Sequence, residues 1–252
     1  MCLSAGAGTR LRPLTDLLAK PLCPVGNRPL LDWAVEALSG ATSDLAVNVC
    51  HHPERMRAHL AAHHPSVHVS LESPVALGTA GAIGRLRTWL DGRAALVVNA
   101  DTWHRVDLRP FVHDWDGERV RLVTSTPGPF GPGSGVVASL LPPWAVDRCA
   151  PEPSGLWKQI WSPAIDVGRA ETVHVVDGDG PVVDCGTPSD YLRANLIVSG
   201  GESVIGEGAV VEGTVERCVV WPGSVVGPEE HLVEVIRADG LTVAADQSGR
   251  RI

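Results

Sequence analysis

The sequence has 252 residues, enough for one large domain or for a domain of about 200 residues with a small appendage. Its hydrophobic fraction of 44% excludes a disordered or low-complexity chain, and its formal net charge of −8 argues against a general nucleic-acid binder. No apolar run approaches the roughly 18 to 20 residues of a membrane span, and no charged-then-apolar leader opens the chain. We therefore expect a cytoplasmic protein with neither a membrane nor a nucleic acid as partner.

Helical and strand patterns alternate from residue 30 to about 200. Apolar periodicity predicts, in chain order, a helix over 29–39, a strand over 45–49, a helix over 53–62, a strand over 67–71, a helix over 79–90 and a strand over 94–98. Strands separated by 10 to 15 helical residues are typical of βαβ units. We predict an α/β, Rossmann-like fold with a largely parallel sheet and helices on both faces. Such sheets bind ligands beyond the carboxyl ends of their strands, here near residues 4 and 99.

The pattern changes after Asn195. Ile205 and Val211 lie six positions apart, and Val220 and Val226 repeat this spacing after a slip of one or two residues. This resembles the hexapeptide repeat of a left-handed β-helix, with a plain β-hairpin as the alternative. Two or three rungs are too few to stand alone, so we expect the segment to pack against the first domain or a partner. The expected domains are 1–198 and a short tail, 199–252, which could also join copies of the chain into a homo-oligomer.

The strongest motif, Ser-Ala-Gly-Ala-Gly-Thr-Arg-Leu-Arg, occupies positions 4 to 12. Gly6 and Gly8 let the backbone approach a ligand, and successive exposed amides form an anion-binding nest. Arg10 and Arg12 add positive charge suited to phosphates. The motif is not a Walker A loop, because no Gly-Lys-Ser/Thr follows, and it lacks the third glycine of a dinucleotide fingerprint. By itself a Gly-x-Gly is often only a tight turn, so its meaning depends on the residues around it.

Together with Ala-Lys-Pro-Leu-Cys-Pro-Val at positions 19 to 25, this stretch resembles the N-terminal signature of the sugar-1-phosphate nucleotidyltransferases. That family includes mannose-1-phosphate guanylyltransferases and glucose-1-phosphate thymidylyltransferases. In the family, the glycine loop wraps the nucleotide, the arginine meets the triphosphate and the lysine meets the reacting phosphates. The resemblance places Arg10 and Lys20 in these catalytic roles, although each by itself fits a solvated surface charge.

A second matching segment, Leu-Gly-Thr-Ala-Gly at 77–81, resembles the family's turn that borders the base. Its glycines would let a flat ring lie against the backbone, and Thr79 is available as a helix N-cap. An ordinary helix entry is the alternative interpretation. The nucleotide-binding residues that the resemblance implies are Ala5, Gly6, Gly8, Thr9, Arg10, Gly78 and Thr79.

Two aspartates complete the match. Asn99-Ala100-Asp101, after the apolar strand, resembles the family's Asn-Gly-Asp, and a carboxylate there is costly to bury unless it binds a cation or partner. Val-Asp-Cys-Gly-Thr-Pro at 183–188 resembles the block whose aspartate is the second magnesium ligand, while Thr187 and Pro188 also suit a plain helix cap. The resemblance implies Mg²⁺ as cofactor, held by Asp101 and Asp184, which are also expected to be catalytic.

The resemblance covers roughly residues 1 to 198 and departs from the family in three places. The chain starts three residues before the glycine loop, so we expect a truncated first strand or a start that lies upstream. Ala100 replaces a glycine. The Glu-Lys-Pro block that helps hold the sugar phosphate is missing, and the chain resumes the family pattern at Gly135. This leaves Asn99 and Gly135 on the sugar-phosphate side.

The resemblance implies an enzyme that transfers a nucleotidyl group from a nucleoside triphosphate (NTP) to a sugar 1-phosphate, giving an NDP-sugar and pyrophosphate. GTP with mannose 1-phosphate is the favoured pair, and a uridylyl- or thymidylyltransferase is the alternative within the class. The missing Glu-Lys-Pro block favours another class, a non-catalytic nucleotide-sugar-binding regulatory subunit, which the intact charged residues oppose. No covalent intermediate is needed, so none of the six cysteines is expected to act as a nucleophile.

Overall fold

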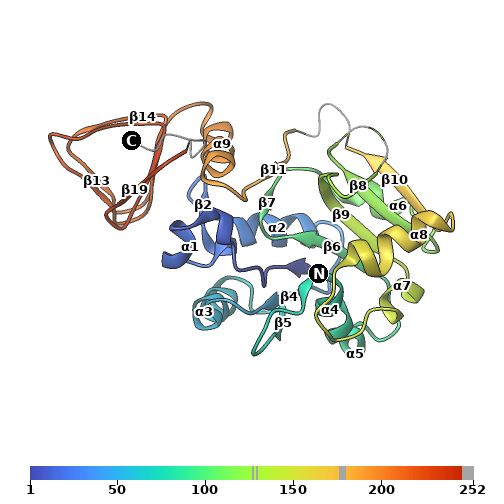
Figure 1. The fold of residues 1–252 in the computed structure, drawn as a ribbon. Helices are drawn as coiled ribbons and strands as arrows, with labels where there is room; N and C mark the ends of the chain where they lie inside the picture. The colour runs from blue at the N-terminus through green and yellow to red at the C-terminus, as the bar shows by residue number, and fades with distance from the viewer. Residues whose placement is uncertain (127, 129, 176–179, 246–252) are drawn as a thin grey trace. The chain divides into compact units, whose positions relative to one another are not determined.

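Figure 1 shows the computed structural model of the chain, which describes residues 1–126, 128, 130–175 and 180–245. The chain divides into two compact units. Unit 1 comprises Met1–Gly6, Trp33–Ala100 and His104–Val182, and unit 2 comprises Ala7–Asp32, Asp101–Trp103 and Val183–Ile252. The domains expected from the sequence, 1–198 and 199–252, stay a prediction.

Unit 1 is built on a seven-stranded sheet of order β10-β8-β9-β6-β1-β4-β5. Its strands are β1 (Cys2–Leu3), β4 (Ala46–Val49), β5 (His68–Leu71), β6 (Ala95–Asn99), β8 (Val120–Thr124), β9 (Val136–Leu141) and β10 (Ala170–His174). Neighbouring strands are parallel except at β9, which runs antiparallel to both β6 and β8. The predicted α/β fold with a largely parallel sheet is confirmed.

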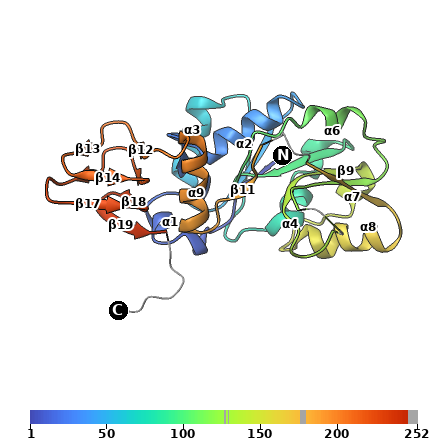
Figure 2. The ribbon, with the colours of Figure 1, turned by 90° about the horizontal axis from the view of Figure 1, so that it is seen from above.

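Helices cover both faces of this sheet. One face carries α4 (Gly78–Arg85), α5 (Arg87–Leu90), a π-helical turn (Trp157–Trp161), α7 (Pro143–Asp147) and α8 (Ser162–Asp166). Their apolar side chains, among them Ile83, Val146 and Ile160, form one buried cluster with those of the strands. The opposite face carries α2 (Leu30–Ser39), α3 (Pro53–His63) and α6 (Arg109–His113) (Figure 2). The helix expected over 79–90 is interrupted at Leu86, between α4 and α5.

Unit 2 contains the loop that follows β1 and the segments that pack on it. The loop includes η1 (Thr9–Leu11), α1 (Leu14–Leu17), η2 (Lys20–Leu22) and the paired strands β2 (Pro24–Val25) and β3 (Arg28–Pro29). Strand β7 (Thr102–Trp103) pairs antiparallel with β11 (Val183–Asp184), and α9 (Pro188–Ser199) follows. Thr187 caps α9 by accepting a hydrogen bond from the Asp190 amide, with Pro188 as the first helical residue, which confirms the predicted cap.

The C-terminal part of unit 2 winds into a coil of triangular outline (Figure 1). Its strands are β12 (Val204–Ile205), β13 (Val210–Val211), β14 (Thr214–Glu216), β15 (Val219–Val220), β16 (Val225–Val226), β17 (His231–Val233), β18 (Val235–Ala238) and β19 (Leu241–Ala244). Successive turns of the coil pair in parallel, as Val210 does with Val225. A plain hairpin is therefore wrong for β12–β17, because its strands would be antiparallel. The segment is β-helix-like, and its hand and hexapeptide period stay predictions.

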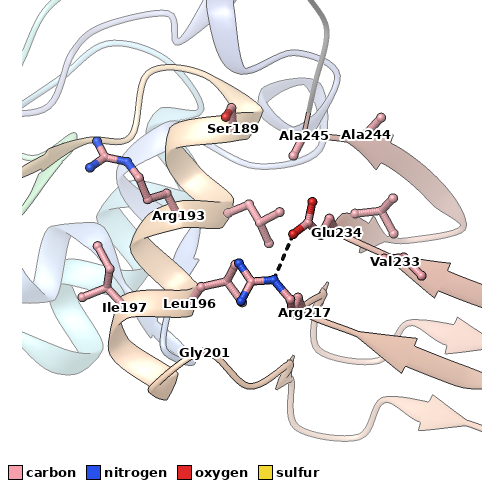
Figure 3. A pocket seen from close by; sticks show the side chains of 12 residues that line it. Ser189, Arg193, Leu196, Ile197, Gly201, Arg217, Val233, Glu234, Ala244 and Ala245 are labelled. Atoms are coloured by element: carbon pink, nitrogen blue, oxygen red, sulfur yellow. Dashed lines mark hydrogen bonds and ion pairs between the residues drawn. The ribbon is translucent and has the colours of Figure 1, made fainter.

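This tail packs against earlier parts of unit 2, as expected for so few rungs. The Trp221 indole donates to the Tyr191 hydroxyl at 3.0 Å, and that hydroxyl donates to the Pro24 carbonyl. The Asn27 side chain donates to the Ile205 carbonyl at 2.8 Å. Between α9 and the tail lies a groove of about 660 Å³ in which Arg217 and Glu234 pair at 2.9 Å (Figure 3). Within the described ranges, no helix combines the length and apolar character needed to cross a membrane.

His104 should make the stability of the fold depend on pH. His104 is 4% exposed, and burial lowers the pKa of His104 to about 4. Because an unfolded histidine titrates near pH 6.5, the unfolded state binds more protons between pH 6.5 and pH 4. The free energy of unfolding should therefore fall as the pH falls through this window, by up to about 1.4 kcal/mol per pH unit from this group. Urea unfolding of wild type and His104→Gln over this pH range should show a shallower dependence of the free energy of unfolding on pH in the variant. Equal pH dependence in the two proteins would contradict the assignment of the effect to His104.

Candidate active site

The glycine loop leaves the sheet at the carboxyl end of β1. Leu3 pairs with Asn99 in parallel register, so the loop and Ala100 start from the same edge of the sheet, as expected from the sequence. Ala5 is buried, whereas Gly6 and Thr9 are exposed. A Cβ atom on Gly6 would meet nothing within 4 Å, so this part of the loop is open to close approach by a ligand.

Gly8 is required by the backbone itself. Its φ is +62°, and a Cβ atom there would lie 2.8 Å from Thr15 Cγ2 and 3.0 Å from Lys20 Cβ. The Thr15 hydroxyl also donates to the Gly8 carbonyl at 2.9 Å. The glycine therefore allows the loop to press against the side chain of Lys20.

Lys20 lies at the centre of a cluster of charges in unit 2. Its side chain is 6% exposed, and its Nζ lies 2.8 Å from Asp101 Oδ2 and 3.6 Å from Asp184 Oδ1. Arg10 Nη2 lies 3.4 Å from the other Asp184 oxygen, and the Arg10 side chain is largely exposed. The structure thus brings together all four residues that the sequence analysis selected as catalytic.

Strand pairing places the two aspartates side by side although they are far apart in the chain. Asp184 pairs with Thr102 in the β7–β11 ladder, and the Cys185 amide donates to the Asp101 carbonyl at 2.9 Å. Gly186 then clears a space for Arg10, because a Cβ atom there would lie 2.6 Å from Arg10 Nη2. Sequence analysis did not select Gly186; its position two residues after Asp184, in the matched block, is the only signal it carries.

The donor set fits a divalent cation. Both carboxylates are partly exposed, at 40% for Asp101 and 56% for Asp184, and both approach the same ammonium group. They can therefore share a single cation, and carboxylate oxygens are the ligands that Mg²⁺ prefers. The metal role of this pair stays a prediction.

Two cysteines that sense the charge of Lys20, Cys23 and Cys185, are poor nucleophiles. Burial raises the pKa of Cys23 to about 12, with the Lys20 charge opposing the shift, and does the same to the pKa of Cys185. Because the thiolate is the reactive form, both thiols are unreactive near neutral pH. All six cysteines are free, and all except Cys50 are buried.

The predicted base-side turn forms the start of α4, and its residues contact the segment around Ser154. Helix α4 begins at Gly78, and the Leu156 amide donates to the Thr79 hydroxyl at 2.8 Å. The expectation that Thr79 caps the helix is therefore wrong, because its hydroxyl accepts a hydrogen bond from the Leu156 amide and none from the first turn of α4. Cβ atoms on Gly78 and Gly81 would lie within 2.4 Å of the carbonyl oxygens of Ser154 and Glu152. These glycines therefore allow the backbone of the segment around Ser154 to pack directly against the start of α4.

The two residues assigned to the sugar-phosphate side lie at the same edge of the unit 1 sheet. Asn99 ends β6 and Gly135 directly precedes the antiparallel neighbour β9. The Gly135 amide donates to the Thr126 hydroxyl at 3.0 Å. Lys158 lies exposed in the π-helical turn and forms no ion pair among the residues that the structure describes.

Comparison with known proteins identifies the family. The model of the nucleotidyl transferase family matches residues 1–130, which is half of the chain and includes the glycine loop, Lys20 and Asp101. The chain belongs to the nucleotidyl transferase family. This confirms the resemblance found in the sequence.

Relatives of this chain include fungal proteins. The mannose-1-phosphate guanyltransferase of Schizosaccharomyces pombe is 29% identical over 232 residues, which cover 78% of this chain and 63% of the relative. That of Aspergillus fumigatus is 38% identical over 107 residues, or 40% of this chain and 29% of the relative. The chain thus spans less than two thirds of the length of these relatives.

Solved structures agree on the fold. A Bacillus anthracis protein assigned as a glucose-1-phosphate thymidylyltransferase superposes with a TM-score of 0.65 at 19% identity, over 78% of this chain and 93% of that one. HddC from Yersinia pseudotuberculosis gives a TM-score of 0.62 at 18% identity, over 78% and 97%.

Two glycine substitutions separate the roles of the loop. Gly8→Ala should lower the free energy of unfolding by more than about 1 kcal/mol, because its positive φ and contact with Lys20 leave no room for Cβ. Gly6→Ala, with open space around it, should change stability by no more than about 0.5 kcal/mol. Urea unfolding measures both, and equal losses would contradict the special role of Gly8.

Proposed function

We propose that this nucleotidyl transferase transfers a nucleotidyl group from an NTP to a sugar 1-phosphate and releases pyrophosphate. The observation that carries the proposal is the buried Lys20 ammonium between Asp101 and Asp184, with Arg10 paired to Asp184. An oxygen of the sugar phosphate attacks the α-phosphorus, the new P–O bond forms, and the bond to the β-phosphate oxygen breaks. Such a transfer needs positioned charges rather than a covalent intermediate, in keeping with the unreactive thiols.

Each charged residue has a separate part in this proposal. Arg10 has a largely exposed side chain next to Asp184, and we assign it to neutralising the charge of the departing pyrophosphate. Lys20 is held in place by its two carboxylates and acts on the α-phosphate and the attacking phosphate. Asp101 and Asp184 would hold Mg²⁺, which when bound neutralises phosphate charge and orients phosphate oxygens.

The favoured substrates are GTP and mannose 1-phosphate. The names of the fungal relatives support this pair, and uridylyl or thymidylyl transfer is the alternative. The absent Glu-Lys-Pro block leaves Asn99 and Gly135 as the proposed contacts on the sugar-phosphate side, with the nucleotide on the glycine loop and the start of α4. The tail is the proposed surface for any homo-oligomer, and the proposed location is the cytoplasm.

The reaction can be tested by pyrophosphate release over a panel of NTPs and sugar 1-phosphates. Lys20→Gln should lower kcat by about 10² to 10³, since one positioned charge on the reacting phosphates is lost. Lys158→Gln is the matched control, because it removes the chain's other lysine from an exposed position outside the proposed site. Nucleotide binding by the wild type without turnover of any pair would overturn the enzyme proposal and favour the regulatory subunit.

The choice of base can be tested without turnover. A thermal-shift series with GTP, UTP, dTTP and ATP, each with Mg²⁺, should give the largest rise in Tm with GTP. A ligand at 100 times its Kd stabilises the native state by about 2.7 kcal/mol, so differences in affinity between the bases are measurable. A larger rise in Tm with UTP or dTTP would make that nucleotide the proposed substrate in place of GTP and would leave the proposed reaction unchanged.

A further inference from the structure

A chain of buried polar groups joins three neighbouring strands of unit 1 at their carboxyl ends. Ser4 follows β1, Asn48 lies in β4 and Glu72 follows β5. The Ser4 amide donates to Asn48 Oδ1 at 2.8 Å, and the Ser4 hydroxyl donates to the Asn48 carbonyl. Asn48 Nδ2 donates to Glu72 Oε1 at 2.8 Å, and the Leu77 amide donates to Glu72 Oε2 at 2.7 Å. We call Ser4, Asn48, Glu72 and the Leu77 amide the strand-end network.

The network is expensive to bury. Asn48 and Glu72 are each 2% exposed and Ser4 is 7% exposed. In the part of the chain that the structure describes, no basic side chain forms an ion pair with Glu72, and its two oxygens accept bonds from neutral N–H groups instead. Apolar residues at these positions would avoid the cost of desolvating a carboxylate. The burial of these polar groups therefore favours a role in the geometry of this edge of the sheet over a role in stability alone.

The two ends of the network coincide with the two segments proposed to bind the nucleotide. Ser4 is the first residue of the glycine loop, directly before Ala5 and Gly6. Leu77 is the residue before α4, directly before Gly78 and Thr79. Asn48 and Glu72 thus connect the backbone of the loop to the backbone of the base-side turn through hydrogen bonds.

We propose that Asn48 and Glu72 are positioning residues that hold the glycine loop and the start of α4 in register for the nucleoside triphosphate. This role rests on the proposed function. It predicts an effect on the NTP alone, because the network makes no described contact with Lys20, Asp101 or Asp184 and does not include Asn99 or Gly135.

Exchange of the two side-chain types gives a sharp test. In Glu72→Gln, two N–H donors must face each other at the Leu77, Asn48 or Ser4 end, whichever way the amides turn. In the double variant Asn48→Asp with Glu72→Gln, Asp accepts from the Ser4 amide and from the Gln amide, and the Gln oxygen accepts from the Leu77 amide. Every hydrogen bond and the net charge are then restored with the central bond reversed.

Glu72→Gln should raise KM for the NTP about tenfold, the effect of one unsatisfied buried donor, with KM for the sugar 1-phosphate unchanged within about twofold. The rise in Tm on adding NTP should shrink in parallel. The double variant should recover most of both effects. Val120→Ala is the control for stability, because it shortens a fully buried side chain at the amino end of β8 and should lower Tm without changing KM for the NTP.

The outcomes distinguish this role from the proposed function. An active wild type with an unchanged NTP KM in Glu72→Gln would overturn the positioning role alone. Equal losses in the single and double variants would also overturn it, since the hydrogen-bond pattern would not be the cause. A wild type that neither binds nor turns over any NTP would overturn the proposed function, and the positioning role with it.

Discussion

The burial of one ammonium group shapes unit 2. Lys20 is 6% exposed, and a charge with so little access to water is stable only when opposite charges lie beside it. Asp101 and Asp184 supply them, but only because β7 and β11 pair and bring Asp101, directly before β7, beside Asp184 in β11. Gly8 leaves room for the side chain of Lys20, and Gly186 leaves room for the guanidinium group of Arg10. The charge cluster thus depends on three segments that fit around Lys20: the glycine loop with Arg10, Asp101, and Asp184 with Gly186.

In unit 1, the buried polar groups of the strand-end network are stabilised by neutral hydrogen bonds rather than by ion pairs. Glu72 is as deeply buried as Lys20, yet its carboxylate is satisfied by an amide side chain and a backbone N–H. Ion pairs leave a charge that phosphates and cations can compete for, whereas neutral hydrogen bonds hold backbone at a fixed distance. The first arrangement suits groups that act on a reacting phosphate, and the second suits groups that hold a binding loop in place.

The tail has a structural connection to the segment that carries Lys20. The Trp221 indole and the Pro24 carbonyl share the Tyr191 hydroxyl, and Pro24 lies four residues after Lys20. Burial raises the pKa of Tyr191 well above its usual value, and its hydroxyl donates to the Pro24 carbonyl. Few rungs are enough here, because α9 contacts β12, β18 and β19 of the tail and the Trp221 indole donates to Tyr191 of that helix.

Local pattern in the sequence predicted the parts that depend on near neighbours: the alternating helices and strands between residues 29 and 98, and the cap at Thr187. The family resemblance, rather than local pattern, selected the glycine loop and the two aspartates. Local pattern failed where a distant segment competes for a local group, as at Thr79, whose hydroxyl binds the Leu156 amide instead of capping its helix. It was silent on Asn48 and Glu72, because a single polar residue in or after an apolar strand carries no signal until its partners are known. Only the tertiary structure decided that Lys20 is buried between two carboxylates and that Ser4, Asn48 and Glu72 form one hydrogen-bonded network. These hydrogen bonds and ion pairs join residues far apart in the chain, and the distances between such residues depend on how the strands and loops pack.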